Sequence, residues 1–201
     1  MRLPTFLFAA VLATVAVSAS AQPVEPVPPD AEPDAAAIAP SRESRLDSLF
    51  ATLQSTSDGR TAKTAESDII ELWLESGSDT VDLLMDWTLN AMEQKNYPLA
   101  LDYLDRIVSM EPDYVEGWNK RATVHFLVDD YSKAIADIEQ TLALEPRHFG
   151  ALSGLGTIMR EIGDTDRAVV AFREALTVDP HLDSVKEALE EIEKEEGGQD
   201  I

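Results

Sequence analysis

Apolar residues in the segment 81–180 recur at intervals of three and four, and the pattern of 81–114 is repeated in 115–148 and again in 149–180. Positions i, i+3, i+4 and i+7 lie on one face of a helix, so each period predicts two amphipathic helices. Turn-forming residues at Asn96, Asp130 and Gly163 separate the two helices of each pair. The aligned apolar and small positions are Leu84, Trp118 and Leu152; Thr88, Ala122 and Gly156; Ala100, Ala134 and Ala168; Leu104, Ile138 and Phe172; Val108, Leu142 and Leu176.

Three prolines mark the same period. Pro112, Pro146 and Pro180 are evenly spaced, and each follows an acidic residue. Proline disfavours helical geometry in the residue before it, so each one ends the second helix of a pair. A fixed period of roughly 34 residues predicts a stack of identical supersecondary units, each burying its apolar face on the next.

These columns resemble the tetratricopeptide repeat, which has a large residue at position 4, a small one at 8, alanine at 20 and proline at 32. Three repeats fit the pattern: 81–114, 115–148 and 149–180. The resemblance implies an all-α fold, a right-handed solenoid of helical hairpins. The runs 118–123 and 145–152 are also similar to small exported bacterial tetratricopeptide proteins of unknown role, which implies a Gram-negative periplasm.

Two weaker segments flank the regular repeats, so we expect the solenoid to span 42–196. Residues 42–77 are predicted to form a degenerate helical pair that caps the array, with Glu66 where alanine belongs and Ser78 where proline belongs. Residues 181–196 form a predicted capping helix with a polar outer face. Residues 197–201 are expected to be a disordered tail. The apolar residues of the degenerate pair that keep the register are Phe50, Leu53, Ile70, Trp73 and Leu74.

The segment 1–41 predicts export. Residues 1–21 have the apolar run and the Ala19-Ser20-Ala21 ending of a signal peptide, with cleavage after Ala21. Residues 22–41 are rich in proline and acid, which favours a disordered linker. The protein is therefore expected to be periplasmic or secreted, and not embedded in a membrane after cleavage.

The formal net charge of −22 makes the chain strongly acidic. Nucleic acids and anionic lipids would be repelled, because no basic face is available to neutralise phosphate. The acidic residues serve either as a solvated surface or as a surface for a cationic protein or peptide partner. The oligomeric state is not defined by the sequence.

In tetratricopeptide arrays the first helices of successive repeats line a concave groove, and their positions 2, 5, 9 and 12 face it. Flexible methionines at one end of this groove would suit peptide recognition, although the methionines and Phe126 could equally pack between helices. Only Asn119 fits the pattern of a chaperone carboxylate clamp, and the positions of its lysines and arginines hold Met85, Asp86, Gly150 and Gly154, so no such clamp is expected. The predicted partner-binding residues are Met85, Leu89, Met92, Glu116, Asn119, Thr123, Phe126, Ser153, Thr157 and Arg160, with Asp82 and Gly150 at equivalent positions.

Arg121 and His125 place a cation and an imidazole where the other repeats have apolar residues. Two interpretations remain open at this stage. Arg121 could form a structural ion pair with a carboxylate, for which Asp102, Asp105 and Asp137 are candidates. Alternatively, the group could bind an anion or a peptide terminus. That possible anion site comprises Arg121, His125, Arg147 and His148.

No catalytic, cofactor or metal site is predicted. The three histidines lack the close spacing of metal ligands, and Gly150, Gly154 and Gly156 are interpreted as helix-packing positions because no phosphate-loop lysine follows them. The leading hypothesis is a non-enzymatic scaffold or adaptor that binds a protein partner in its groove. The alternative is a carrier of a small anionic or peptide ligand in the middle repeat, and self-assembly through the ends of the array is a third possibility.

Overall fold

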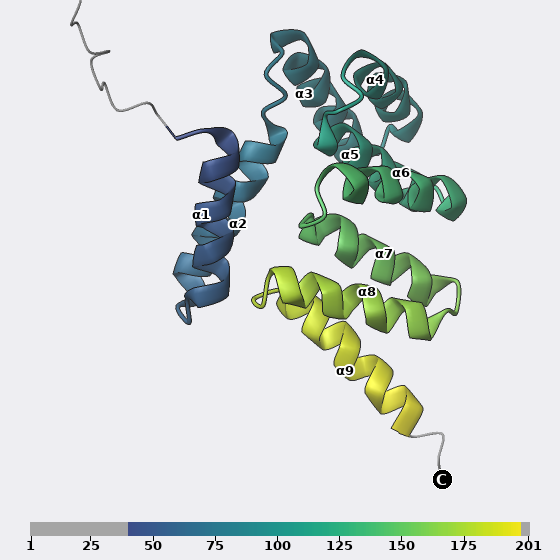
Figure 1. The fold of residues 1–201 in the computed structure, drawn as a ribbon. Coiled ribbons are helices and arrows are strands. Elements are labelled where there is room, and N and C mark those ends of the chain that lie inside the picture. Colours follow the sequence, from purple (N-terminus) through teal and green to yellow (C-terminus); the bar gives the residue numbers. More distant parts are fainter. Residues whose placement is uncertain (1–39, 198–201) are drawn as a thin grey trace, which may run out of the picture. The chain divides into compact units, whose positions relative to one another are not determined.

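The computed structural model describes residues 40–197, which form nine α-helices and no strand (Figure 1). Within this range no helix is long and apolar enough to cross a membrane. The helices are α1 Arg42–Ser55, α2 Gly59–Leu74, α3 Asp79–Glu93, α4 Tyr97–Met110, α5 Val115–Leu127, α6 Tyr131–Leu144, α7 Phe149–Glu161, α8 Thr165–Val178 and α9 Asp183–Gly197.

Several predicted features lie outside the described residues. They are the signal peptide 1–21, the linker 22–41 as far as residue 39, and residues 198–201 of the predicted tail. At the two boundaries the structure extends the predicted elements slightly. Ser41 caps α1 by accepting a hydrogen bond from the Ser44 amide at 3.2 Å, and α9 runs to Gly197, just beyond its predicted end.

Each regular repeat forms the predicted hairpin: α3 with α4, α5 with α6, and α7 with α8. The same turn joins the two helices each time, because Lys95, Asp129 and Gly163 all adopt a positive φ of 56° to 82°. The next residue then caps the second helix with a side-chain oxygen, as Asp164 does for the Arg167 amide at 3.1 Å. The equivalent caps are Asn96 and Asp130.

Small residues allow these helices to pack closely. Ala100, Ala134 and Ala168 share one repeat position and are fully buried. A Cβ added at Gly156 would lie 2.4 Å from the Phe172 ring, so the helices α7 and α8 can approach this closely only with glycine there. The prediction that Gly156 is a packing position is confirmed.

The acidic residues before Pro146 and Pro180 stabilise the turns between repeats. Glu145 accepts a hydrogen bond from the Arg147 amide at 3.0 Å, and Asp179 accepts one from the His181 amide at 2.9 Å. A side-chain oxygen bonded to an amide slightly further along the chain is a common way to fix a turn. These turns connect α6 to α7 and α8 to α9.

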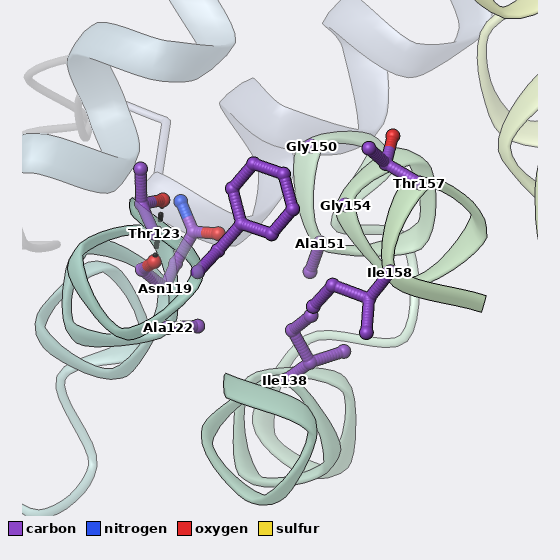
Figure 2. A pocket seen from close by; sticks show the side chains of 10 residues that line it. Asn119, Ala122, Thr123, Ile138, Gly150, Ala151, Gly154, Thr157 and Ile158 are labelled. Carbon is purple, nitrogen blue, oxygen red and sulfur yellow. Dashed lines mark hydrogen bonds between the residues drawn. The ribbon is translucent and has the colours of Figure 1, made fainter. Parts of the chain in front are cut away.

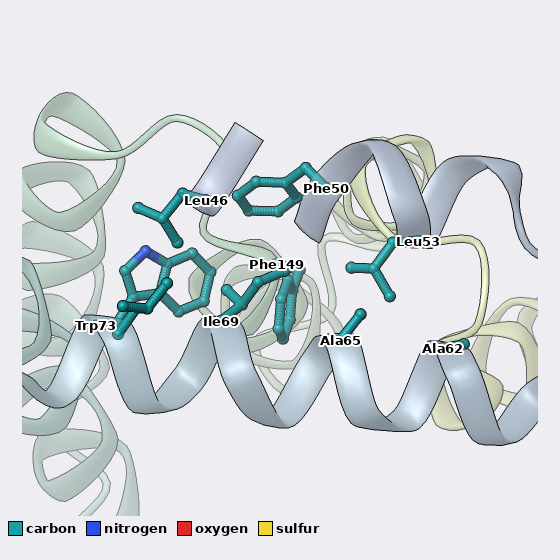
Figure 3. Packing of buried hydrophobic residues seen from close by; sticks show 9 residues of the cluster. Leu46, Phe50, Leu53, Ala62, Ala65, Ile69, Trp73 and Phe149 are labelled. Atoms are coloured by element: carbon teal, nitrogen blue, oxygen red, sulfur yellow. The ribbon is translucent and has the colours of Figure 1, made fainter. Parts of the chain in front are cut away.

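The α1–α2 hairpin forms as predicted but does not continue the stack. Gly77, with a φ of 82°, lies in the turn before α3, and α2 contacts α5 instead of packing along α3 as a preceding repeat would. Its apolar residues surround Phe149, the first residue of α7 (Figure 3). Of the five residues expected to stay in register, Ile70 is exposed, whereas Phe50, Leu53 and Trp73 are buried in this separate cluster.

The hairpin lies along the row of turns between repeats. Tyr114, His148 and Leu182 occupy the same repeat position, and all three contact it. Tyr114 donates a hydrogen bond to the Leu74 carbonyl at 2.8 Å, and the His148 ring stacks on Trp73 with 4.1 Å between centroids. The repeat period therefore aligns three side chains that together dock α1 and α2.

Candidate functional site

A pocket of about 150 Å³ opens between α5 and α7, on the surface where the groove residues were predicted (Figure 2). Its floor is apolar, because Ile138 of α6 and Ile158 of α7 close it from below. Asn119 and Thr123 form one wall and Thr157 lies on the opposite side. The remaining lining residues are Ala122, Phe126, Gly150, Ala151 and Gly154.

Two glycines line this pocket. A Cβ added at Gly154 would meet only the Ile138 side chain, at 3.8 Å, and one at Gly150 would meet only the His148 ring, at 3.3 Å. The distance at Gly154 is an ordinary contact, whereas the distance at Gly150 is tighter than most Cβ contacts. The prediction that Gly154 is a packing position is therefore wrong, because its missing side chain leaves room in the groove. Gly150 lies close to the His148 ring and also lines the pocket, as expected for a groove position.

The polar atoms of the pocket are arranged to accept hydrogen bonds. Thr123 donates its hydroxyl proton to the Asn119 carbonyl, and Thr157 donates its own to the Ser153 carbonyl, each at 3.0 Å. The Asn119 amide nitrogen donates to Glu116 at 3.1 Å. Each side-chain oxygen keeps lone pairs, so a ligand here would be held through its N–H or O–H groups.

A buried polar network supports the Asn119 side of the pocket. Glu116 and His148 are each only 2% exposed, and they lie 3.0 Å apart (Oε2 to Nε2). Because His148 Nδ1 accepts the Ala151 amide at 3.0 Å as the cap of α7, its Nε2 carries the proton and donates to Glu116. Lys120 adds a salt bridge to Glu116 of 2.7 Å.

This network sets the charge of Glu116. Burial alone would raise its pKa, but the hydrogen bond from His148 and the charge of Lys120 outweigh burial and lower the pKa to about 2. A carboxylate whose pKa is lowered by folding stabilises the native state above its unfolded pKa of about 4.3. That contribution is lost as the pH falls from there toward 2. Glu116 was predicted to contact a partner, but here it is a buried structural anion.

The other predicted groove residues are divided between core and surface. Met85 is buried and Met92 packs against the same cluster, so the expected methionine-rich end of the groove is not open. Leu89 is exposed on α3. Ser153 donates to the Phe149 carbonyl at 2.7 Å, and Arg160 pairs with Glu191 of α9 at 2.9 Å. Of the predicted partner-binding residues, Asn119, Thr123, Phe126 and Thr157 line the pocket.

Arg121 and His125 both lie next to Asp137. Arg121 forms two parallel hydrogen bonds with that carboxylate, of 2.9 and 2.7 Å, and a third of 2.9 Å with Asp105 of α4. These bonds raise the pKa of Arg121. Burial lowers the pKa of His125, although Asp137, 3.8 Å away, acts in the opposite direction. The structural ion pair considered from the sequence is formed, with two of the three candidate carboxylates.

Arg147 and His148 do not join this group. Arg147 pairs with Asp47 of α1 at 2.7 Å and with Glu145 at 3.2 Å, and its guanidinium lies 4.4 Å from the centre of the Phe50 ring. It lines a more open cleft between α1 and the turns that precede α5 and α7. The four residues of the possible anion site therefore contact three separate sets of partners, because His148 bonds to Glu116, and each guanidinium is already neutralised by carboxylates.

The sequence missed the apolar half of the pocket. Ala122, Ala151 and Ile158 fit the helical pattern as ordinary core positions, and nothing in the pattern separates a buried residue that meets a neighbour from one that meets a void. One signal could have indicated it. Gly154 lies on a helix that lines the groove, and the equivalent positions of the two earlier repeats hold Asp86 and Lys120. The alignment of the repeats therefore showed that a side chain is missing there.

A stack of helical hairpins with a hollow between the first helices of successive hairpins defines a class of repeat protein that serves as a scaffold for other proteins. A family model described as the tetratricopeptide repeat matches residues 89–193, more than half of the chain. The chain belongs to the tetratricopeptide repeat family. Members are generally non-enzymatic scaffolds for protein–protein interaction.

One curated relative shares a segment of this chain. A TPR repeat-containing protein of Rhizobium etli is 43% identical over 99 residues, which cover 49% of this chain and 48% of the relative. The match thus spans about half the length of each protein. It supports the family and leaves the role of the whole protein open.

Solved structures show the same fold at low identity. The first TPR domain of Spaghetti (RPAP3), bound to an HSP90 peptide, has a TM-score of 0.56 at 18% identity, covering 58% of this chain and 93% of that one. The Arabidopsis OM64 TPR domain also gives 0.56, at 16% identity, over 61% of this chain and 98% of that one. MamA gives 0.54 at 16% identity, over 77% and 84%. These likenesses concern the fold alone.

Proposed function

We propose that this protein is a non-enzymatic adaptor that binds a partner peptide in its groove and holds one apolar side chain of that peptide in the pocket between α5 and α7. The observation that carries the proposal is the hollow above an apolar floor that Gly154 leaves open and Gly150 lines. A rim of hydrogen-bond acceptors surrounds an apolar cavity, as expected for a site that takes an apolar side chain and holds the amide N–H groups beside it.

The size of the pocket favours a side chain over a free small molecule. Pockets that enclose drug-sized ligands measure roughly 300–1,000 Å³, and this one is about 150 Å³. The alternative hypothesis, a carrier of a small anionic ligand at Arg121, gains no support, because Asp105 and Asp137 already hold that guanidinium. An anion would have to displace them.

The partner segment is proposed to be neutral or cationic, because the chain has a net charge of −22. A peptide ending in a carboxylate, such as the HSP90 peptide bound by the Spaghetti domain, is a poor candidate. The pocket offers it acceptor oxygens, and the clamp positions hold Met85, Asp86, Gly150 and Gly154. We further propose that the interaction takes place in the periplasm or outside the cell, in keeping with the predicted signal peptide.

A peptide selection with a matched pair of variants tests this function. Peptides selected from a random library against the purified protein should carry an apolar anchor residue, and Gly154→Met should weaken their binding at least about tenfold by filling the pocket. The control is Gly59→Met, because the space around a Cβ at Gly59 is empty and far from the pocket-lining residues. Peptides that bind Gly154→Met as tightly as the unchanged protein would rule out this pocket as the binding site.

A further inference from the structure

A second surface, on the first regular repeat, has the features of a docking site. Two large apolar side chains, Leu83 and Trp87, lie one helical turn apart on α3 and are 48% and 45% exposed. Tyr103 of α4 lies beside Trp87, with 5.7 Å between ring centroids. These three residues are called here the end face. Tyr103 is half-buried, whereas about half of Leu83 and of Trp87 stays exposed within residues 40–197.

Internal symmetry shows what normally covers the position of Leu83. The equivalent residue of the second repeat is Gly117, where an added Cβ would lie 2.8 Å from Ile107 of α4. The equivalent residue of the third is Ala151, which is fully buried in one cluster with Ile138 of α6. In both cases the second helix of the preceding repeat occupies the site.

The position of Trp87 gives the same result. Its counterpart in the second repeat, Arg121, bonds to Asp105 of α4. Its counterpart in the third, Leu155, packs in one cluster with Ile135 of α6. A helix therefore fills this place at both internal junctions. At the first repeat α2 would be that helix, but α2 lies along the turns between repeats.

The charges around the end face indicate the kind of helix that fits. Helix α3 carries Asp79, Asp82, Asp86 and Glu93, and it has no lysine or arginine. Asp79 lies one turn before Leu83, and Asp86 is next to Trp87; both are exposed. A helix docked here would meet an apolar centre bordered by carboxylates. A second copy of the chain, paired face to face, would bring the same acids together and be repelled.

We propose that the end face binds an amphipathic helix of a partner protein whose apolar stripe is bordered by lysine or arginine residues. The partner helix takes the place on α3 that α4 takes on α5 and that α6 takes on α7. Its apolar residues pack on Leu83 and Trp87, and its basic residues lie opposite Asp79 and Asp86. This surface is separate from the pocket between α5 and α7, so the protein would contact partners at two places.

A designed helix is the direct probe. A fluorescent peptide as long as α4, 14 residues, with leucines at helical spacing and lysines elsewhere, should bind the protein in fluorescence anisotropy at physiological salt. Two control peptides separate the causes: one with glutamate in place of lysine, and one of the same composition with the leucines spread around the helix. Both should bind at least about tenfold more weakly. Equal binding of either control peptide would overturn the proposal.

Variants of the protein locate the site. Leu83→Gln with Trp87→Gln should weaken the lysine peptide at least about tenfold without changing the net charge, and Asp79→Asn with Asp86→Asn should weaken it and flatten its salt dependence. The control is Val170→Gln, at an apolar position on α8 that is 56% exposed. Unchanged binding to the Leu83, Trp87 double variant would overturn the inference.

Two further outcomes would also count against the end face. Loss of binding in Gly154→Met alone would assign the peptide to the pocket, which supports the proposed function and overturns the inference. Sedimentation showing a dimer that Leu83→Gln with Trp87→Gln converts to a monomer would make a second copy the occupant, and so would overturn it too.

Discussion

Glycine serves opposite purposes at two nearby positions of α7. Gly156 allows α7 to approach the Phe172 ring, where any added Cβ would lie within 2.4 Å. Gly154 permits no such close approach, because the nearest atom to a Cβ added there would be in Ile138, at 3.8 Å. The sequence shows the same residue type on the same helix, and only the neighbours across the interface separate a packing role from an open pocket.

Alanine at each position should therefore have opposite effects on stability. Gly154→Ala should raise the free energy of unfolding by up to about 1 kcal/mol, because alanine favours the helix and its methyl group meets only an ordinary contact. Gly156→Ala should lower it by about 1–3 kcal/mol, because Phe172 must move. Urea unfolding of the two variants measures both values. A destabilised Gly154→Ala would show that the pocket tolerates no side chain.

The same two positions recur in each of the three repeats, one on the first helix and one on the second, but the residue types differ from repeat to repeat. The first repeat has an aromatic pair, Trp87 with Tyr103, and the second has a bidentate ion pair, Arg121 with Asp137. The same two positions of the third repeat hold the apolar residues Leu155 and Ala171.

The third repeat has no ion pair at these positions, so substituting its residues, leucine and alanine, for Arg121 and Asp137 of the second repeat should be tolerated. Asp137→Ala alone should destabilise the protein by about 2–4 kcal/mol, since a half-buried guanidinium loses its main partner. The double variant Arg121→Leu with Asp137→Ala should recover most of that loss. A double-mutant cycle from urea unfolding gives the coupling. Additive losses would mean that Arg121 and Asp137 stabilise the protein independently of each other, which would contradict this prediction.

The sequence predicted the regular helices well, because the columns that define them record contacts between adjacent repeats. It placed α4, α6 and α8 correctly, and their prolines marked their ends. The α1–α2 hairpin was different. Its contacts, such as that of Trp73 with His148, join residues far apart in the chain and follow no period. The pocket was partly predicted: Asn119, Thr123, Phe126 and Thr157 line it as expected, whereas Gly154, which leaves it open, was interpreted as a packing position.

At the scale of the whole described domain, the hairpin changes how the array holds together. In a simple repeat array each unit contacts only its neighbours, so the repeats unfold in a loosely coupled way. Here one hairpin contacts successive turns: Tyr114 before α5, His148 before α7 and Leu182 before α9. It also binds the last turn through the Leu53 carbonyl, 3.1 Å from His181 Nε2. Repeats that do not touch each other are thereby joined through α1 and α2.

Removing the central contact of the hairpin should therefore reduce cooperativity as well as stability. Trp73 is buried against Phe50, His148 and Phe149, so Trp73→Ala should cost about 3–5 kcal/mol. The urea m-value should fall, and circular dichroism and the fluorescence of the remaining tryptophans should no longer report one transition. Ile70→Ala, at an exposed position of α2, should leave both unchanged. A Trp73→Ala variant with a lower midpoint but the original m-value and coincident transitions would show that the repeats are coupled without the hairpin.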